Sequence, residues 1–418
     1  MGRIADVSEQ LWDGEVSTDD LHPMAPLNEV EELANGVAFV SGFANVTALR
    51  TEAGLVLVDT GAVMVAEQTV GLVRSWNTQP LHTAVYTHGH VDHVFGTAIF
   101  DEEARANKWA PPRVVAHEAT PARFDRYKRT AGYNGCINAR QFRVPGLQWR
   151  TDYRYPDVTY AKAMTLTVGE LRLELQHARG ETDDHTWLWI PDRKLLCTGD
   201  LFIWASPNAG NPQKVQRYAL DWAVALRAMA GLGAEIMCPG HGLPIRGADR
   251  IRLALSETAE LLETLHDQTL ALMNAGATLD EVLHAVKAPA RLLERPYLRP
   301  VYDEPDFVVR NIWRLYGGWY DGNPANLKPA PEAAVAKEVA ALSGGARRLA
   351  TRARELAASG EMALACHLAE LAGRAAPDDA EVWEIRAEVY KRRARSERSL
   401  MARGVYSAAA DDKGGVRP

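Results

Sequence analysis

Residues 87–93, Thr-His-Gly-His-Val-Asp-His, follow directly on the apolar, strand-like run Thr-Ala-Val-Tyr. They place three imidazoles and one carboxylate within six residues, a dense cluster of the side chains that bind transition metals. His88 and His90 can point to one side of a loop, while Asp92 and His93 reach a second point nearby. The pattern predicts two metal ions close together, and a solvated polar loop is the alternative.

The surrounding sequence alternates between strand and helix signals. From Val37 onward, short runs rich in Val and Thr are separated by Gly-containing turns, whereas residues 64–77 have helical periodicity. A second series of strand-like runs spans residues 164–204. This alternation predicts a layered α/β domain.

Three further motifs accompany the histidine stretch in a fixed order. They are Leu-Val-Asp-Thr-Gly around Asp59, the pair Gly199-Asp200, and Pro-Gly-His-Gly over residues 239–242. Together the four motifs resemble the metallo-β-lactamase superfamily over about residues 35–245. The resemblance implies a four-layered αβ/βα sandwich with the metals at one edge, between the two sheets. It also implies one zinc ion on His88 and His90, another on Asp92, His93 and His241, and Asp200 as the bridge between them.

The resemblance assigns chemical roles as well. Asp59 matches an aspartate that orients the ligand loop without binding metal. Two divalent ions flanking Asp200 would lower the pKa of a shared water toward neutrality and so supply a metal-bridged hydroxide. Asp92 and Asp200 are the expected catalytic residues. Zinc suits these ligands, and manganese or iron also occupies mixed nitrogen and oxygen sites.

One position departs from the usual superfamily pattern. Where a further ligand histidine is common in a Gly-His-Thr-Pro-Gly turn, residues 179–185 read Arg-Gly-Glu-Thr-Asp-Asp-His. Glu181, directly after the glycine, is the expected carboxylate replacement, and His177 and His185 are its competitors. A glutamate at this position resembles the alkylsulfatase branch of the superfamily. The extra negative charge is expected to help release a sulfate or phosphate product.

The C-terminal part resembles the same branch. Residues 316–327, Tyr-Gly-Gly-Trp-Tyr-Asp-Gly-Asn-Pro-Ala-Asn-Leu, are similar to the signature that leads into the alkylsulfatase dimerisation domain. Residues 332–401 are rich in Ala, Leu, Glu and Arg, and part of them resembles a tetratricopeptide-type helical repeat. One such unit cannot bury its apolar faces alone, so a homodimer through this region is expected. The chain is expected to lack the sterol-carrier-like third domain of full-length alkylsulfatases, which argues against long-chain alkyl sulfates as substrates.

The chain's 418 residues exceed what one hydrophobic core usually supports, so more than one domain is expected. The expected parts are an N-terminal arm (1–30), a catalytic domain of the metallo-β-lactamase fold (31–285), an all-α dimerisation domain (286–405) and a disordered tail (406–418).

Cationic and polar side chains near the metals would bind an anionic ester. Each candidate arginine is as readily a surface or ion-pairing residue, and Asn323 lies in the turn-forming sequence Asp-Gly-Asn-Pro. Arg310 and Arg314 lie one helical turn apart beside the C-terminal signature. The substrate-binding candidates are Arg140, Arg217, Arg310, Arg314, Tyr320 and Asn323.

Composition excludes several classes of protein. A formal net charge of −7 argues against nucleic-acid binding, and no apolar run reaches the length of a membrane span. The N-terminal sequence has no signal-peptide pattern, so a cytoplasmic protein is expected. The leading function is hydrolysis of a small-molecule sulfate ester. The alternatives are another bond on the same site (lactone, thioester, phosphodiester or β-lactam) and a non-catalytic oligomeric protein.

Overall fold

The computed structural model of the chain describes residues 2–412, and two compact units follow from their contacts. The first unit comprises Met1–Ala131, Arg150–Gly276 and Glu281–Gly317. The second comprises Gly132–Trp149, Ala277–Asp280 and Gly318–Pro418. This division differs from the expected boundary near residue 286, because helices that follow the second sheet pack on the first unit as far as Gly317.

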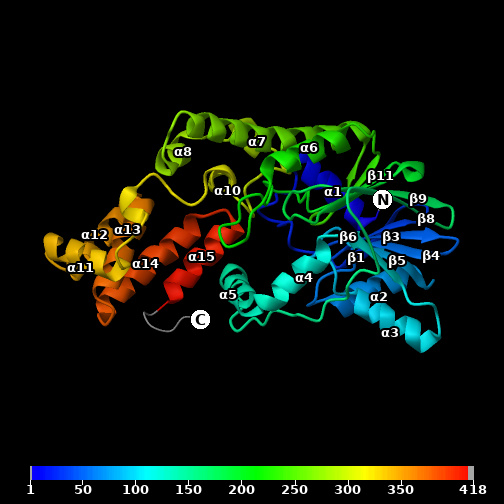
Figure 1. Cartoon of the computed structure of the whole chain (residues 1–418), viewed down its shortest axis with the longest axis horizontal. Helices are drawn as coiled ribbons and strands as arrows, with labels where there is room; N and C mark the ends of the chain where they lie inside the picture. Colours follow the sequence, from blue (N-terminus) through cyan, green and yellow to red (C-terminus); the bar gives the residue numbers. More distant parts are fainter. Residues whose placement is uncertain (1, 413–418) are drawn as a thin grey trace. The chain divides into compact units, whose positions relative to one another are not determined.

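One sheet of the first unit has seven strands in sequential order (Figure 1). Its first four strands pair antiparallel, and the last four pair parallel through connecting helices. Val37–Ser41 and Gly54–Val58 are buried along their whole length, as the Val-rich sequence predicts. The strands are β1 (Glu29–Ala34), β2 (Val37–Ser41), β3 (Val46–Thr51), β4 (Gly54–Val58), β5 (Leu81–Val85), β6 (Arg113–His117) and β7 (Val158–Tyr160), with helices α2 (Ala66–Trp76), α3 (Thr97–Asn107) and α4 (Thr120–Arg129) between them.

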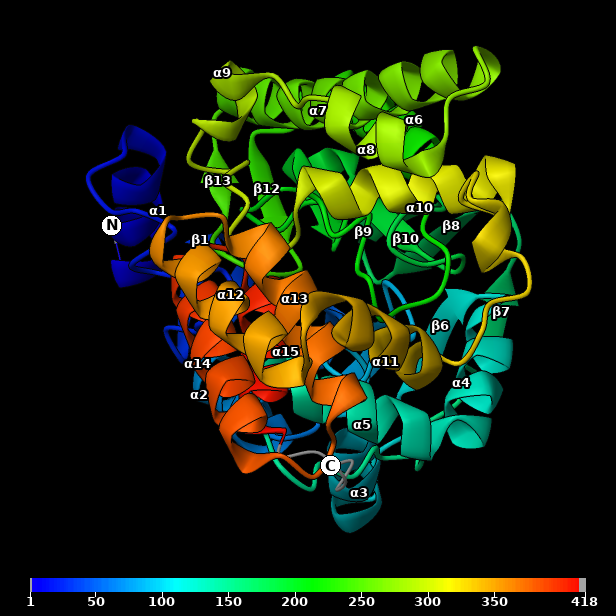
Figure 2. The same cartoon turned by 90° about the vertical axis from the view of Figure 1, so that its left-hand side faces the viewer.

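The second sheet has six strands in the order β13-β12-β11-β10-β9-β8. Only the β11–β12 pair is parallel among these described strands. Helices α6 and α7 pack side by side (Figure 2). The elements are β8 (Ala163–Val168), β9 (Leu171–His177), β10 (Thr186–Ile190), β11 (Leu195–Gly199), α6 (Ala219–Ala230), β12 (Ile236–Pro239), β13 (Ile245–Arg246) and α7 (Ala248–Asn274), followed by α8 (Leu279–Ala285), α9 (Ala290–Leu293) and α10 (Pro305–Gly317). Two sheets with helices confirm the predicted α/β sandwich.

The two sheets are joined by backbone hydrogen bonds at one edge. The amide of Thr186, at the start of β10, donates to the carbonyl of Thr87 after β5 (2.7 Å). The amide of Asn45, before β3, donates to the carbonyl of Gly240 after β12 (2.8 Å). Because β4, β5, β11 and β12 all end at this edge, the loops that follow them lie together.

The N-terminal arm expected at residues 1–30 is partly helical, which corrects the expectation of an irregular segment. Helix α1 (Arg3–Asp13) buries Ile4 and Leu11. The carboxylate of Glu31 accepts hydrogen bonds from the amides of Gly2 and Ile4, where a negative charge stabilises the start of a helix. Pro23 and Pro26 lie well beyond the end of this helix and do not interrupt it.

The second unit is helical, as predicted for the C-terminal region. Its helices pack through small side chains, for example Ala353, Ala365 and Ala369 around Val389. The disordered tail expected from residue 406 begins instead as helix, and residues 413–418 lie outside the described part of the chain. The helices are α11 (Glu332–Ser343), α12 (Ala346–Ala358), α13 (Met362–Ala375), α14 (Ala380–Ser396) and α15 (Leu400–Asp411).

Helix α5 (Ala131–Phe142) comes from the middle of the catalytic sequence, but almost all of it belongs to the second unit. It meets α15 at Gly404, where a Cβ atom would lie 2.0 Å from the carbonyl oxygen of Gln141. Arg143 also forms an ion pair with Asp411. The close approach of the two backbones therefore requires glycine at position 404.

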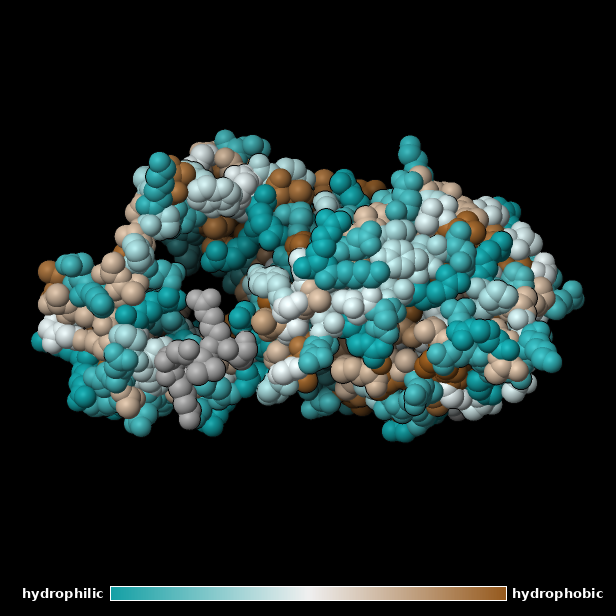
Figure 3. Space-filling view, turned by 60° about the horizontal axis from the view of Figure 1, so that its bottom comes forward, coloured by the Kyte–Doolittle hydropathy of each residue, from teal (hydrophilic) through white to brown (hydrophobic). Residues whose placement is uncertain are grey.

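Polar and apolar residues are interspersed on the face of the molecule in Figure 3. No helix within residues 2–412 has both the length and the apolar character needed to cross a bilayer.

Candidate metal centre

Seven side chains from the loops at the joined sheet edge converge in two groups. Each group has its ligand atoms within 4.8 Å of one another. The first ligand group is His88, His90, Glu181 and Asp200, and the second ligand group is Asp92, His93 and His241. These are the seven metal ligands that the sequence motifs predict.

Asp200 lies between the two groups. Its Oδ2 atom is 3.8 Å from Nε2 of His88 and 3.4 Å from Nε2 of His241. Its Oδ1 atom is 3.4 Å from Nε2 of His93. A single carboxylate therefore faces ligands of both groups, the position that a bridging ligand needs.

Spacing within each group fits a metal ion. In the second group, Oδ2 of Asp92 is 3.7 Å from Nε2 of His93 and 3.4 Å from Nε2 of His241. In the first group, Nε2 of His88 is 2.8 Å from Nδ1 of His90. Ligand atoms about 2 Å from a central ion lie at such separations from one another.

The buried polar atoms of the centre also fit metal ions. Nε2 of His93, Oε2 of Glu181 and Oδ1 of Asp200 are buried without a hydrogen-bond partner. Such atoms are costly inside a protein unless something compensates them. A divalent ion in each group would accept all three lone pairs, so the residues present fit the metals that the fold implies.

Burial places the two histidines of the first ligand group in the protonation state that binds metal. Burial lowers the pKa of His88 and His90 well below the usual value, so both rings are neutral. Burial also raises the pKa of Glu181, against the opposing charge of Arg217. Neutral imidazole is the form that binds metal, and a nearby dication would restore the charged carboxylate.

Asp59 holds the second ligand group from behind. Its Oδ1 atom accepts a hydrogen bond from the Thr87 amide (2.7 Å), and its Oδ2 atom lies 2.7 Å from Nδ1 of His93. Asp59 itself is buried and has a left-handed backbone, with φ of 60°, which costs free energy in a residue other than glycine. Nδ1 of His241 similarly contacts the carbonyl of Phe43 (2.6 Å). Both rings thereby present Nε2 to the metal position.

Among the three candidates for the last ligand, only Glu181 lies in a ligand group. His185 instead accepts a hydrogen bond from the Asp200 amide through Nε2 (3.1 Å) and stacks on the His88 ring. His177 stacks on His117 and contacts the Asp183 carbonyl. The geometry therefore favours Glu181.

Arg217 is the predicted substrate residue that lies at the centre. Its side chain is buried, forms an ion pair with Oε1 of Glu181 (2.5 Å) and donates to the Asn208 carbonyl (2.5 Å). The Asn208 amide group also donates to Oε1 of Glu181. Glu181 thus shares its charge with a guanidinium beside the first ligand group.

Of the other substrate candidates, two lie on α10 in the first unit and three belong to the second unit. Arg314 donates to Gln216 and Asn311, and Arg310 is exposed on α10. Asn323 accepts from the Ala325 amide, a turn-forming contact. Tyr320 is exposed, and Arg140 lies on α5 in the second unit.

Three residues near the centre were not predicted from the sequence. Lys214 interacts electrostatically with Glu181 and Asp92, and burial together with Arg217 lowers its pKa to about 7. Asp184 and Arg123 form a buried ion pair beside the histidine loop. The position of Asp184 in the acidic run Glu-Thr-Asp-Asp was the one available signal.

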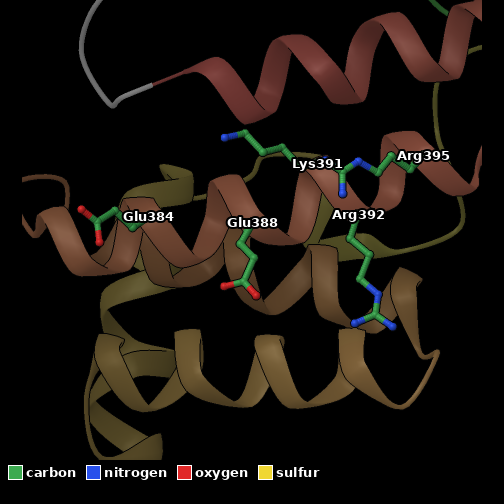
Figure 4. A pocket seen from close by; sticks show the side chains of 5 residues that line it. All are labelled: Glu384, Glu388, Lys391, Arg392 and Arg395. Carbon is green, nitrogen blue, oxygen red and sulfur yellow. The ribbon is translucent and has the colours of Figure 1, made fainter.

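A separate hollow on the second unit has a different character. Five charged side chains line it, all from α14 (Figure 4). All five are exposed, and none is part of a ligand group among the described residues. It is a solvated charged surface, lined by Glu384, Glu388, Lys391, Arg392 and Arg395.

Two known families match separate parts of the chain. The metallo-beta-lactamase superfamily matches residues 41–241, and the alkyl sulfatase dimerisation family matches residues 278–414. The chain thus has a metallo-beta-lactamase domain followed by an alkyl sulfatase dimerisation domain.

The chain is similar to alkylsulfatases along most of its length. A linear primary-alkylsulfatase from Pseudomonas sp. is 27% identical over 380 residues, 85% of this chain and 71% of that protein. An (R)-specific secondary-alkylsulfatase from Pseudomonas sp. is 27% identical over 393 residues, 88% of this chain and 59% of that protein. The chain therefore spans less than two thirds of this second relative.

The fold matches a solved structure as well. The stereoselective inverting sec-alkylsulfatase Pisa1 from Pseudomonas sp. superimposes with a TM-score of 0.83 at 24% identity, over 93% of this chain and 66% of that chain. This likeness shows the shared fold.

Proposed function

We propose that the chain is a metal-dependent hydrolase of sulfate esters. The observation that carries this proposal is the pair of ligand groups joined by Asp200, with a glutamate in place of a histidine in the first group. The dimerisation domain and the alkylsulfatase relatives support the choice of a sulfate ester. Hydrolysis of a lactone, thioester, phosphodiester or β-lactam is the competing outcome.

The chain's own residues would divide the work. His88, His90 and Glu181 would hold one divalent ion, the second ligand group would hold another, and Asp200 would touch both. Bound there, the two ions would acidify a water molecule and stabilise negative charge that develops on the ester. We propose zinc for both ions, and metal analysis after loading with zinc, manganese or iron distinguishes these metals.

Positive charge from the protein supports an anionic substrate. Arg217 lies within 2.5 Å of Glu181, and Lys214 interacts with the same carboxylate. Guanidinium and ammonium groups bind oxyanions such as sulfate. The oxygens of a sulfate group close to Glu181 would therefore replace part of the contacts that these two cations make with the carboxylate. Glu181 would then keep the cations in place when the product leaves.

We also propose a homodimer through the helical domain. Within this unit, Leu342 on α11 is 89% exposed and Leu364 on α13 is 54% exposed. The match to the alkyl sulfatase dimerisation family over residues 278–414 supports the dimer. Sedimentation at micromolar concentration should give twice the chain mass, and a monomer would contradict the dimer. A cytoplasmic location stays a prediction.

A panel of substrates tests the proposed reaction. Purified protein loaded with zinc is assayed against short alkyl sulfates, lactones, phosphodiesters, thioesters and β-lactams. The proposal expects sulfate release well above background, lost in His90→Ala and kept in His367→Ala, a matched change at an exposed histidine on α13. If sulfate release is no faster than background and another ester is hydrolysed, the sulfatase proposal is wrong and hydrolysis of that ester takes its place.

A further inference from the structure

The loop with His88 and His90 is fixed by a buried carboxylate outside both ligand groups. Asp184 lies in the turn between β9 and β10, and its side chain is fully buried. Its Oδ2 atom accepts a hydrogen bond from the amide of Gly89 (2.9 Å). Gly89 is the single residue between the two histidines, so this bond sets the backbone from which both rings project.

Helix α4 supplies the other partners of Asp184. The hydroxyl of Thr120 donates to Oδ2 of Asp184 (3.0 Å), and Nε of Arg123 lies 2.7 Å from Oδ1. Arg123 is 3% exposed and also pairs with Asp183. One carboxylate therefore joins three segments of the first unit: the β9–β10 turn, the histidine loop and α4.

The space around Gly89 leaves little freedom for the loop to move. A Cβ atom at position 89 would lie 2.9 Å from Cδ of Arg123, 3.0 Å from Cε1 of Phe124 and 3.2 Å from Oδ2 of Asp184. The amide of Gly89 is thus held by its hydrogen bond to Asp184, and the α-carbon of Gly89 packs against α4. These contacts restrain the distance between the His88 and His90 rings.

Charge balance gives the pair a second role. The side chain of Arg123 packs against Gly89, between the two histidines of the first ligand group. An uncompensated guanidinium at this place would also repel a cation in the first ligand group. Asp184, which is fully buried beside it, supplies the negative charge that offsets it.

We propose that Asp184, through its ion pair with Arg123, is a positioning residue that sets the metal affinity of the first ligand group. The proposal rests on the metal binding proposed above. It adds that Asp184 affects the ion of only one ligand group, which metal binding alone does not require. The second ligand group is held instead by Asp59 and by the carbonyl of Phe43. Loss of Asp184 should therefore weaken one ion and spare the other.

The test is a chelator titration that counts bound ions per chain. Wild-type protein, Asp184→Asn and Asp183→Asn are loaded with cobalt, whose visible spectrum reports each coordination site, and are then titrated with a competing chelator. Asp183→Asn is the matched control, because it removes a neighbouring carboxylate that also pairs with Arg123 but does not bond to Gly89. Outer-shell changes of this kind typically cost about 10- to 100-fold in metal affinity.

The expected result is a loss of about 10-fold or more for one ion in Asp184→Asn, with the second ion unchanged and Asp183→Asn close to wild type. Gly89→Ala should lose the same ion, because its Cβ pushes the loop away from α4. Thr120→Val, which removes only one hydroxyl contact, provides a milder variant if Asp184→Asn does not fold, and it should show a smaller loss at the same site.

The outcomes separate this inference from the proposed function. If the wild-type chain binds no ions, the metal function itself fails. If the wild-type chain binds two ions and Asp184→Asn and Thr120→Val bind both with unchanged affinity and spectra, the positioning role is wrong. Equal weakening of both ions would also overturn it, since that result indicates a general loss of structure.

Discussion

The two ligand groups of the metal centre share Asp200 but are built differently. The second group has one side chain, Asp59, and one backbone carbonyl behind its histidines. The first group is surrounded by two buried arginines, Arg123 and Arg217, each paired with carboxylates. The first group would therefore bind its ion beside two buried protein cations.

The structural origin of this asymmetry is the ligand Glu181. A neutral histidine at this position would need no counter-charge, whereas a buried carboxylate does. Arg217 and the Asn208 amide group supply it through Oε1, while Oε2 is left for an ion. The glutamate thus brings cations to the place where an anionic substrate would bind.

Removing the shared ligand should have the largest effect. Asp200→Ala takes the one carboxylate that faces both groups, so both ions should bind more weakly. Activity should fall by more than the roughly 100-fold that is typical of outer-shell changes. Metal content and sulfate release measured on the same sample check this. Two tightly bound ions in Asp200→Ala would show that the groups are independent.

Acid should release the two ions in sequence. Burial raises the pKa of Glu181 to about 8, whereas Asp200 and Asp92 raise the pKa of His241 to about 10 against the effect of burial. A histidine with a raised pKa takes up its proton at higher pH and cannot then bind metal, so falling pH should weaken the second group before the first. Metal content after dialysis at a series of pH values measures this order. Simultaneous release would remove the asymmetry.

Asp59→Asn should weaken the second group selectively. The amide that replaces the carboxylate removes a charge beside His93 and disturbs the orientation of its ring. We expect a loss of about 10- to 100-fold in the affinity of one ion, with the first group retained. If Asp59 and Asp184 support separate ligand groups, chelator titration should show that Asp59→Asn and Asp184→Asn each weaken a different ion. The same pattern in both variants would contradict that separation.

The smallest effect is expected at the cation beside the first group. Arg217→Lys keeps the charge but loses the planar group that reaches both Glu181 and the Asn208 carbonyl. Loss of one charge-assisted hydrogen bond to the substrate costs about 1.5–3 kcal/mol of binding free energy. Because the lysine ammonium still attracts the substrate, the loss should be smaller, and we expect a few-fold rise in KM. Steady-state kinetics with one alkyl sulfate give KM and kcat separately. An unchanged KM would exclude a substrate role for Arg217.

The convergence of the proposed ligands could be predicted from the sequence because most of them, and Asp59 beside them, follow the end of a strand. Asp59, the histidine loop, Asp200 and His241 come directly after β4, β5, β11 and β12, and parallel strand ends meet at one edge. Local periodicity and motif order were enough for the α/β sandwich and for the helical character of the C-terminal region.

Features that depend on packing between distant segments could not be predicted in this way. Arg123 lies on a helix some 60 residues before Asp184, and nothing in either sequence indicates that they pair. Helix α5 has no local mark that assigns it to the helical unit, because its partner Gly404 is far along the chain. The burial of α1 likewise depends on contacts such as that of Ser8 with Pro244.

The most direct test is sulfate release measured while zinc is added to metal-free protein. The account predicts no release without metal and a maximum at two ions per chain. Release by the metal-free chain, or no release at two bound ions, would contradict the proposal that this protein is a binuclear sulfate-ester hydrolase.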